Sequence, residues 1–350
     1  MATERANITV LDRFVAIDNV CAWPNIQMLP DGSVGAFIFN RPSHGQVEGD
    51  IDLWKSDDGR APWQYCSTVS AHEPGTVRMN MAAGVLPSGR VVVLVSGWNL
   101  ESEAEIRTER ILDSIEVCVS DDAGATWQRN GRFEPPEGSG GIMPFGNVRK
   151  TAAGELLVAA YDCRMSSTAR ESRTSSSMVF AGSPDGESFT YRGTIAGDRY
   201  TETDIIASAG GWLAAARTLS DYAHPEDPHS APWVELFRSD DDGRSWSREV
   251  NLSLPNQHPG NLTRLSDGTL MFTCGSRIPG FYGVFARLSR DEGRTWSDPA
   301  LLADDGLSRD LGYPSTVELP SGILLTSYYS RSSSAHRNYH AAVVLWELSM

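Results

Sequence analysis

The sequence contains few cysteines for its length, and none of them is spaced as a metal or disulfide motif. Only five occur in 350 residues, and no CxxC pair is present. They lie at Cys21, Cys66, Cys118, Cys163 and Cys274. An odd number at wide spacing argues against a disulfide framework and against a zinc site. We therefore expect buried free thiols in a reducing compartment, and no metal or other cofactor.

Long apolar runs are also missing. No stretch approaches the 18 consecutive apolar residues of a membrane-spanning helix. The start, MATERANITVLDRF, carries Glu4 and Arg5 where a signal peptide needs an unbroken apolar run. We expect a cytoplasmic protein that does not enter membranes, with a mature secreted form as the alternative.

Basic residues are outnumbered. Thirty Lys and Arg face 45 Asp and Glu, which gives a formal net charge of −15. This balance argues against bulk attraction to nucleic acid or to an anionic membrane. It leaves room for a locally basic pocket that binds a small molecule.

No amphipathic helical stretch is present, whereas a glycine turn followed by an apolar strand recurs six times. The first three copies read LPDGSVGAFIF, LPSGRVVVLVS and TAAGELLVAAY, and the last reads LPSGILLTSYY. The copies begin at Leu29, Leu86, Thr151, Ser208, Leu265 and Leu319. Successive copies start 57, 65, 57, 57 and 54 residues apart. Strand units at such a period predict a β-propeller with six blades.

A second motif, SxDxGx(S/T)W, lies between these turns. Full copies start at Ser120, Ser239 and Ser289, with degenerate copies at Ser56 and Ser183. The motif resembles the Asp-box of the sialidase superfamily. Its Asp and Ser are suited to cap a tight turn, and its Trp to pack between sheets, so we expect a structural role. The resemblance implies an all-β, sialidase-like propeller of six four-stranded antiparallel blades.

The two ends of the chain are expected to meet. The sixth unit has no SxDxGx(S/T)W copy, and the N-terminal ITVLDRFVAI is an apolar strand without a partner. We expect this strand to complete the last blade and remove an open sheet edge. Residues 1–350 would then form a single domain.

The repeat also locates candidate site residues, because propellers bind ligands where the inner strands converge on the axis. The position six residues before each turn should lie at the entry of an inner strand. These positions are Trp23, Asn80, Phe145, Glu202, Pro259 and Tyr313. Charged groups are rarely buried unless paired, so Glu202 and Tyr313 in one ring suggest a site. The alternative is a set of salt-bridged strand ends.

The resemblance to sialidases gives two of these residues roles. In that family a Glu opens the fourth blade and a Tyr opens the last, which matches Glu202 and Tyr313. A tyrosine hydroxyl has a pKa of about 10 and is a poor nucleophile until a carboxylate accepts its proton. Glycosidases with a tyrosine nucleophile are the known exception to the two-carboxylate rule. For the acid/base we expect Asp50 first and Glu48 second, with solvation of a strand edge as the alternative role of both.

The family's carboxylate-binding arginines are only partly matched. Arg217 and Arg277 match those of the fourth and fifth blades, Arg41 matches one further along the first blade, and Arg78 could enter from the second. Where sialidases carry the first arginine, this chain has Trp23. Planar guanidinium groups bind carboxylates in pairs of hydrogen bonds, so this loss predicts poor binding of sialic acid. A Trp at the rim suits an uncharged sugar face.

Two histidines are further candidates for substrate binding. His258 lies at the entry of the fifth blade, and His44 precedes Glu48. Either could donate a proton or bind a sugar hydroxyl, and the alternative is a hydrogen-bonded strand end. His224 and His229 lie in DYAHPEDPHSAPW, whose spacing fits no familiar metal motif, so a polar loop is expected there.

Three functions remain open at this point. The first is a sialidase-like, exo-acting, retaining glycoside hydrolase that acts through Tyr313 and Glu202 on an oligosaccharide or glycoside. The second is a polysaccharide lyase on uronic-acid-containing glycans, with Tyr313, His258 and Arg277. The third is a non-catalytic propeller that binds carbohydrate or protein. Fold alone does not choose among them, because propellers carry unrelated functions.

Overall fold

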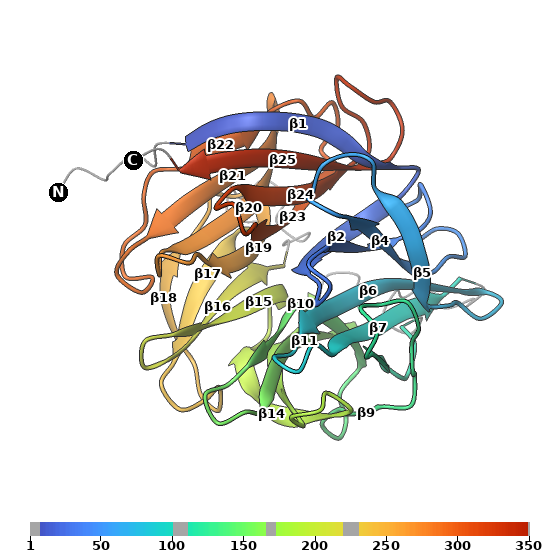
Figure 1. Cartoon of the computed structure of the whole chain (residues 1–350). Helices are drawn as coiled ribbons and strands as arrows, with labels where there is room; N and C mark the ends of the chain where they lie inside the picture. Colours follow the sequence, from blue (N-terminus) through green and yellow to red (C-terminus); the bar gives the residue numbers. More distant parts are fainter. Residues whose placement is uncertain (1–7, 101–110, 166–172, 220–230, 349–350) are drawn as a thin grey trace.

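Six antiparallel sheets surround one axis in the computed structural model, which describes residues 8–100, 111–165, 173–219 and 231–348 (Figure 1). Blade I is β2 (Cys21–Met28), β3 (Val34–Phe39), β4 (Ile51–Ser56) and β5 (Gln64–Ser70). Blade II is β6 (Thr76–Val85), β7 (Val91–Asn99) and β8 (Glu116–Ser120). Blade III is β10 (Gly141–Lys150), β11 (Leu156–Met165), β13 (Ser177–Gly182) and β14 (Ser188–Ala196). The prediction of an all-β, sialidase-like propeller is confirmed.

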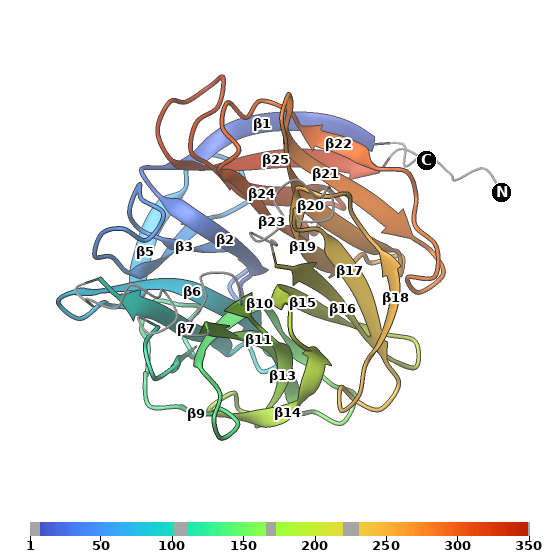
Figure 2. The same ribbon diagram turned by 180° about the vertical axis from the view of Figure 1, so that it is seen from behind.

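The remaining blades follow the same order from the axis outward. Blade IV is β15 (Tyr200–Ser208), β16 (Gly211–Thr218), β17 (Val234–Ser239) and β18 (Ser247–Asn251). Blade V is β19 (Gln257–Arg264), β20 (Leu270–Ile278), β21 (Phe281–Ser289) and β22 (Ala300–Ala303). Blade VI is β23 (Leu311–Glu318), β24 (Leu324–Ser330), β25 (His340–Leu348) and β1 (Ile8–Asp18). Seen from behind, the sheets again radiate from one centre (Figure 2).

Two short strands and one parallel contact modify this plan. β9 (Arg132–Glu134) runs parallel to β14, and β12 (Arg173–Thr174) pairs with β11. β6 and β10 pair in parallel over two residues, so blades II and III share one hydrogen-bonded sheet. The described residues of blade II contain three strands, and only an isolated bridge, Val119 with Gln128, stands where a fourth would lie.

The first and last strands of the chain lie side by side. β1 pairs antiparallel with β25 from Ile8 opposite Leu348 to Asp18 opposite His340. Beside this pair, Ile17 packs with Ile26 of blade I and Leu345 of blade VI, and each is at most 2% exposed. Burial of one such side chain contributes about 1.5–3 kcal/mol, so this cluster stabilises the junction of the two blades.

The SxDxGx(S/T)W motifs form turns held by their own side chains. In the copy between β17 and β18, Ser239 Oγ donates to Asp241 Oδ1 at 2.8 Å and accepts from Gly243 N at 2.9 Å. Trp246 Nε1 donates to Gly243 O at 3.0 Å. Hydrogen bonds from Ser245 lower the pKa of Asp241 to about 2. The aspartate is thus used in fixing an exposed turn.

Every inner strand is irregular at the same place. The antiparallel pairing of each inner strand with its neighbour shifts register once, in the first half of the strand in five blades and just past the middle of β10 in blade III. These shifts enclose or adjoin Trp23, Asn80, Phe145, Glu202, Pro259 and Tyr313. A β-bulge re-aims a side chain that would otherwise face a neighbouring sheet. The six ring positions therefore share a backbone feature as well as a sequence register.

Two residues further along, the inner strands are tied to each other by a polar belt of Asn25, Asn147, Asp204 and Asn261. Asn25 Nδ2 donates to Gly146 O at 2.7 Å, and Asn147 N donates to Asp204 Oδ1 at 2.9 Å. Asn261 Nδ2 donates to Asp204 Oδ2 at 2.8 Å. All four side chains are at most 6% exposed, so the belt fills the axis below the ring.

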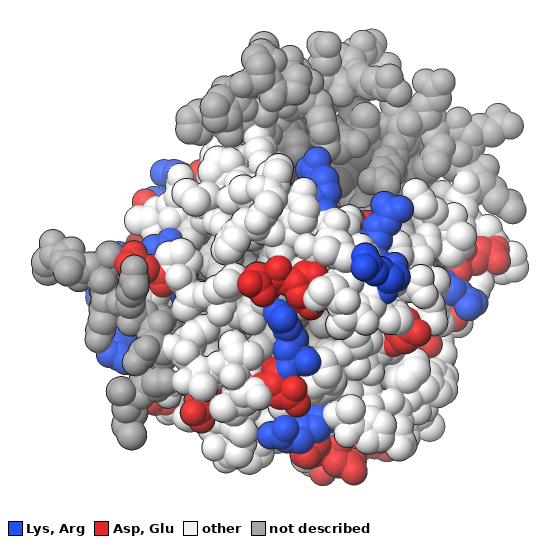
Figure 3. Space-filling view, turned by 90° about the horizontal axis from the view of Figure 1, so that it is seen from above, with Lys and Arg blue, Asp and Glu red and all other residues white. Residues whose placement is uncertain are grey.

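The described residues contain no helix, and so none long and apolar enough to cross a membrane. On the face shown in Figure 3, acidic and basic side chains are interspersed over the described surface.

Candidate active site

Tyr313 and Glu202 meet across the axis from blades VI and IV. The Tyr313 hydroxyl donates to Glu202 Oε1 at 2.5 Å, and each residue is only 5% exposed. Tyr313 has φ = +53° and follows Gly312 at φ = +113°. A bulky residue in the left-handed region is strained, and such strain often occurs at functional sites. The bulge of β23 thus turns this ring into the axis.

Arg217 holds the pair together. Its Nη1 donates to Glu202 Oε1 at 2.7 Å and to the Tyr313 hydroxyl at 3.1 Å. Burial alone would raise the pKa of Glu202, but the Arg217 charge and the hydrogen bond from Tyr313 oppose it, and the pKa is lowered. Glu202 is therefore an ionised acceptor beside a protonated phenol.

The tyrosine is kept neutral in the resting site. Burial, followed by the Glu202 charge, raises the pKa of Tyr313 above its ordinary value, while Arg217 and Arg277 oppose this rise. The Arg277 guanidinium lies 5.6 Å from the centre of the Tyr313 ring. Its Nε donates to Leu311 O at 3.1 Å, which fixes its position. Arg217 and Arg277 are therefore placed to stabilise the negative charge of a phenolate when the proton of Tyr313 moves to Glu202.

Trp23 lies on the floor of the site, and the rim position expected for it is wrong. Its ring centroid is 4.7 Å from that of Tyr313, and it is only 9% exposed. The bulge of β2 directs the indole inward, where it packs on the tyrosine. Phe145 reaches the same ring edge-on, at 5.8 Å. Tyr313 is therefore held between aromatic and cationic neighbours.

His258 also lies in this region but is closed off. It is only 2% exposed. Burial, followed by the charges of Arg217 and Arg277, places its pKa well below the ordinary value. The imidazole is neutral and inaccessible, which fits a structural role better than proton donation to a substrate.

A second acidic group, Asp310, gathers three side chains beside the aromatic floor. Its Oδ1 accepts from the Tyr329 hydroxyl at 2.6 Å and lies 3.2 Å from His44 Nδ1. The Tyr339 hydroxyl donates to its Oδ2. Burial would raise the pKa of Asp310, but the hydrogen bond and charge of His44 and the two tyrosines lower it well below its usual range.

His44 connects this group to the floor. Its ring lies 5.8 Å from Trp23 and 6.2 Å from Tyr329, both edge-on. Tyr329 in turn is 5.8 Å from Tyr313 between ring centroids. Asp310 was not among the residues predicted for the site, although it lies three residues before Tyr313 in RDLGYP. The nearness of Asp310 to Tyr313 in the sequence is the signal that could have identified it as a site residue.

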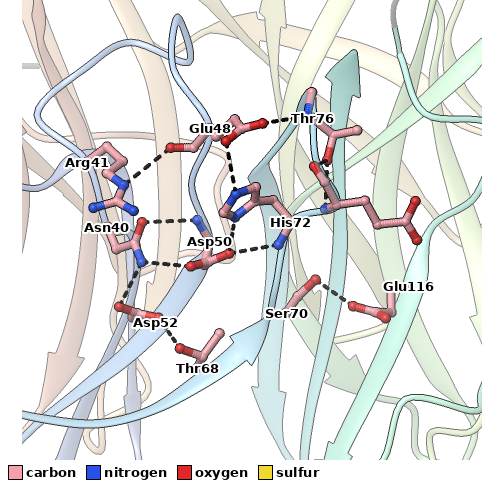
Figure 4. Close-up of polar contacts among 12 residues, drawn as sticks. Asn40, Arg41, Glu48, Asp50, Asp52, Thr68, Ser70, His72, Thr76 and Glu116 are labelled. Atoms are coloured by element: carbon pink, nitrogen blue, oxygen red, sulfur yellow. Dashed lines mark hydrogen bonds and ion pairs between the residues drawn. The ribbon is translucent and has the colours of Figure 1, made fainter. Parts of the chain in front are cut away.

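Asp50 belongs to a different His–Asp pair (Figure 4). Its Oδ1 accepts from His72 N at 2.7 Å and lies 2.6 Å from His72 Nδ1, and its Oδ2 accepts from Asn40 Nδ2 at 3.1 Å. Burial raises the pKa of Asp50, but these hydrogen bonds outweigh it and lower the pKa. A general acid needs a raised pKa, so this environment disfavours Asp50 as proton donor.

Glu48 and the two remaining arginines make their hydrogen bonds and ion pairs, among the described residues, away from Tyr313 and Glu202. Glu48 Oε1 accepts from Gly75 N at 2.5 Å, and Oε2 lies 3.6 Å from His72 Nε2 (Figure 4). Arg41 is exposed and donates to Glu48 O at 3.3 Å. Arg78 is 9% exposed, and its Nε and Nη1 have no hydrogen-bond partner. The structure thus brings together Tyr313, Glu202, Arg217, Arg277, Trp23 and His44, with His258 behind them.

No group of three His, Cys, Asp or Glu side chains suited to hold a metal ion occurs in the described parts of the chain. His224 and His229 lie outside the described residues.

Comparison with known families decides the assignment. The model of the BNR repeat-like domain matches residues 35–326, most of the chain. The chain belongs to this family. No curated protein sequence matches it.

Solved structures show the same propeller at low sequence identity. A Dyadobacter fermentans protein of unknown function has a TM-score of 0.80 at 19% identity, covering 98% of this chain and 100% of that one. Trypanosoma rangeli sialidase with 2,3-difluorosialic acid gives 0.67 at 13%, covering 98% and 57%. Penicillium chrysogenum α-L-arabinanase gives 0.61 at 14%, covering 96% and 98%. The resemblance to the sialidase superfamily of propeller glycosidases is confirmed at the level of fold.

Proposed function

We propose that this protein is an exo-acting, retaining glycoside hydrolase with Tyr313 as nucleophile and Glu202 as its base. The observation that carries the proposal is the 2.5 Å hydrogen bond from the buried phenol to an ionised carboxylate. A nucleophile within reach of a base, held by a third group, is the general arrangement of covalent catalysis. Arg217 is that third group. Several relatives of the same fold are named as sialidases or as an arabinanase, which agrees with this chemistry.

The reaction would proceed in two displacements. In the first, Tyr313 Oη attacks the anomeric carbon, its proton passes to Glu202, and the bond to the leaving oxygen breaks as that oxygen receives a proton. In the second, water attacks the same carbon and gives a proton to the group that protonated the leaving oxygen, the bond to Tyr313 Oη breaks, and the tyrosine recovers its proton from Glu202. Two inversions retain the configuration. Arg217 and Arg277 stabilise the charge on the phenol oxygen in both steps.

The polar belt supports exo action. Asn25, Asn147, Asp204 and Asn261 close the axis below the ring. A glycan could not thread through, so only its terminal sugar would reach Tyr313.

His44 with Asp310 is the proton donor that this geometry favours. The Nδ1 of His44 faces Asp310 at 3.2 Å, which orients the ring and leaves Nε2 for the leaving oxygen. His44 lies beside the aromatic floor, whereas Asp50 is occupied by His72 and Asn40. The proposal therefore moves the acid/base from Asp50 or Glu48 to His44.

The substrate is proposed to be a sugar other than sialic acid. Of the three clamp arginines, only Arg217 and Arg277 contact Tyr313, and Arg217 is already paired with Glu202. Trp23 puts an indole where sialidases carry the first of these arginines. A single carboxylate would find fewer donors here than in a three-arginine clamp.

A screen of aryl glycosides, sialosides and acidic oligosaccharides tests the function. The proposal expects a released sugar whose anomeric configuration, followed by NMR, equals that of the substrate. Inversion would contradict the double displacement. An ultraviolet-absorbing unsaturated product would indicate a lyase, and binding without turnover would indicate a non-catalytic propeller.

A further inference from the structure

A cavity of about 650 Å³ opens on the axis at the end opposite to Tyr313. All six inner strands line it with their final residues, whereas the ring positions lie near the strand beginnings. Its charged lining comes from Arg149, Lys150, Arg264 and Glu318, and uncharged polar side chains such as Gln27 and Thr263 lie among them. The volume falls within the range of small-molecule sites, about 300–1,000 Å³.

The polar belt separates this cavity from the candidate active site. Asn147 and Asn261 both donate to Asp204, and Gln27 Nε2 donates to Asn147 Oδ1 at 2.8 Å below them. Asp204 is fully buried. The cavity is therefore a site of its own and not the rear of the catalytic pocket.

Arg149 brings to the cavity wall a charge with which no described carboxylate pairs within ion-pair distance. Its Nη2 donates to Leu262 O at 2.9 Å, its Nε has no partner, and it forms no ion pair with a described residue. Burial lowers the pKa of Arg149, with the Asp204 charge opposing the shift. Guanidinium groups nevertheless stay protonated in proteins. Arg149 is half-buried with a buried, unpartnered Nε, and an anion in the cavity would offset the cost of its incomplete pairing.

The nearest carboxylate is not available to Arg149. Asp204 Oδ2 accepts from Asn261 Nδ2 and from Leu262 N, both at 2.8 Å, and Oδ1 accepts from Asn147 N at 2.9 Å. Its lone pairs are used by the belt.

The other charges of the cavity wall leave a positive excess. Arg264 donates to both oxygens of Glu292, at 3.0 and 2.8 Å, and is thus neutralised. Glu318 accepts from Ser266 N and Oγ, each at 2.6 Å. Lys150 is exposed beside Arg149, and no carboxylate of the described residues pairs with it. Two cations against one carboxylate is unusual in a chain of net charge −15.

We propose that this cavity binds a small oxyanion, a carboxylate or phosphate on a molecule of about monosaccharide size, through the Arg149 guanidinium with Lys150 at the rim. Arginine suits both groups, because its planar fork matches their paired oxygens. The site is distinct from the catalytic pocket and does not depend on the proposed hydrolase activity.

Isothermal titration of the full chain tests the proposal with three probes: glucuronate, inorganic phosphate and uncharged glucose. We expect at least one of the two anions to bind with one-to-one stoichiometry, and glucose not to compete for that site. Arg149→Gln should weaken anion binding roughly tenfold or more, since a charged hydrogen bond is lost. The matched control is Arg192→Gln. It removes an arginine of β14 that pairs with Glu155, and it should leave the affinity for the anion unchanged.

Two further variants keep the test decisive. Arg149→Lys retains the charge without the planar fork and should bind the anion with intermediate affinity. It serves as the test if Arg149→Gln does not fold. Tyr313→Phe should leave anion binding intact, which separates this cavity from the catalytic pocket. The proposal is overturned if neither anion binds at millimolar concentration, if Arg149→Gln and Arg149→Lys bind normally, or if Tyr313→Phe removes the binding.

Discussion

The Tyr313 hydroxyl lies 2.5 Å from Glu202 Oε1, although 111 residues separate the two in the chain. Arg217 Nη1 touches both oxygens, so the proton, its acceptor and a stabilising cation occupy one small volume. Removal of the Glu202 carboxylate charge should therefore slow the transfer of the proton from Tyr313. Glu202→Gln should lower kcat by about 10²–10⁴-fold, the usual range for a general base, with a smaller change in KM.

The control for Glu202→Gln is Glu187→Gln, which alters a surface ion pair with Arg90. It should keep normal kcat. If the two variants have equal kcat, Glu202 is not the base.

The pH dependence follows from the sign of the Glu202 shift. Because its pKa is lowered in the folded protein, the base is ionised throughout the neutral range and is lost only as pH falls below its ordinary value of about 4.3. Its contribution to stability is likewise present above that pH and disappears on acidification. kcat/KM measured against pH should show no acid limb from Glu202 above about pH 4.5. A limb near neutral pH that vanishes in Glu202→Gln would contradict the account.

The two His–Asp pairs, His44 with Asp310 and His72 with Asp50, offer a matched test of the proton donor. His44→Gln should slow aryl glycosides with poor leaving groups by about 10²-fold or more, and those with good leaving groups far less, because only the former need a proton. His72→Gln alters the pair with Asp50 and should leave both rates near normal. The reverse pattern would return the role to Asp50.

A sialic acid mimic with a free carboxylate should inhibit weakly, in the range of roughly 0.1 mM or above, because only two arginines contact Tyr313. The inhibition constant is measured on whichever glycoside the protein hydrolyses. Nanomolar inhibition, weakened by Arg217→Lys or Arg277→Lys, would show that these arginines bind the carboxylate without a third.

Asp204→Ala should be strongly destabilising. It leaves donors from Asn147, Asn261 and Leu262 without an acceptor in the buried axis. Loss of such a network costs about 3–5 kcal/mol. Asp267→Ala removes one hydrogen bond, to Thr269 N in a turn, and should cost about 1 kcal/mol or less. Urea denaturation compares the two free energies of unfolding, and equal values would mean that the belt contributes little.

Much of this arrangement could be predicted from the sequence, because the repeat has a fixed period. The glycine turns give the number of blades, and the register six residues before each turn locates Tyr313 and Glu202. The same register places Trp23 in the ring, but its burial against Tyr313 instead of at the rim could not be read in this way. It depends on the bulge of β2, which pairing between strands creates and no local residue pattern announces.

The Asp310 group shows the same limit. Its partners His44, Tyr329 and Tyr339 come from other loops and strands, and only closure of the ring brings them together. From the sequence, Asp50 and Glu48 are both plausible acids, but His72 and Gly75 bond to their carboxylate oxygens. Which acid faces the substrate is thus decided by tertiary contacts.

The most direct test of the central claim combines two measurements. The first is the turnover of Tyr313→Phe on a substrate that the wild-type protein hydrolyses with retention of configuration. The second is covalent trapping of the wild-type protein by a fluorinated analogue of that substrate. The variant keeps the ring against Trp23 and removes only the oxygen, so it should fold and bind substrate. We predict a loss of several orders of magnitude in kcat, and a covalent adduct on Tyr313 in the wild-type protein by mass spectrometry. Near-normal turnover in Tyr313→Phe, or an adduct on another residue, would contradict the assignment of Tyr313 as nucleophile.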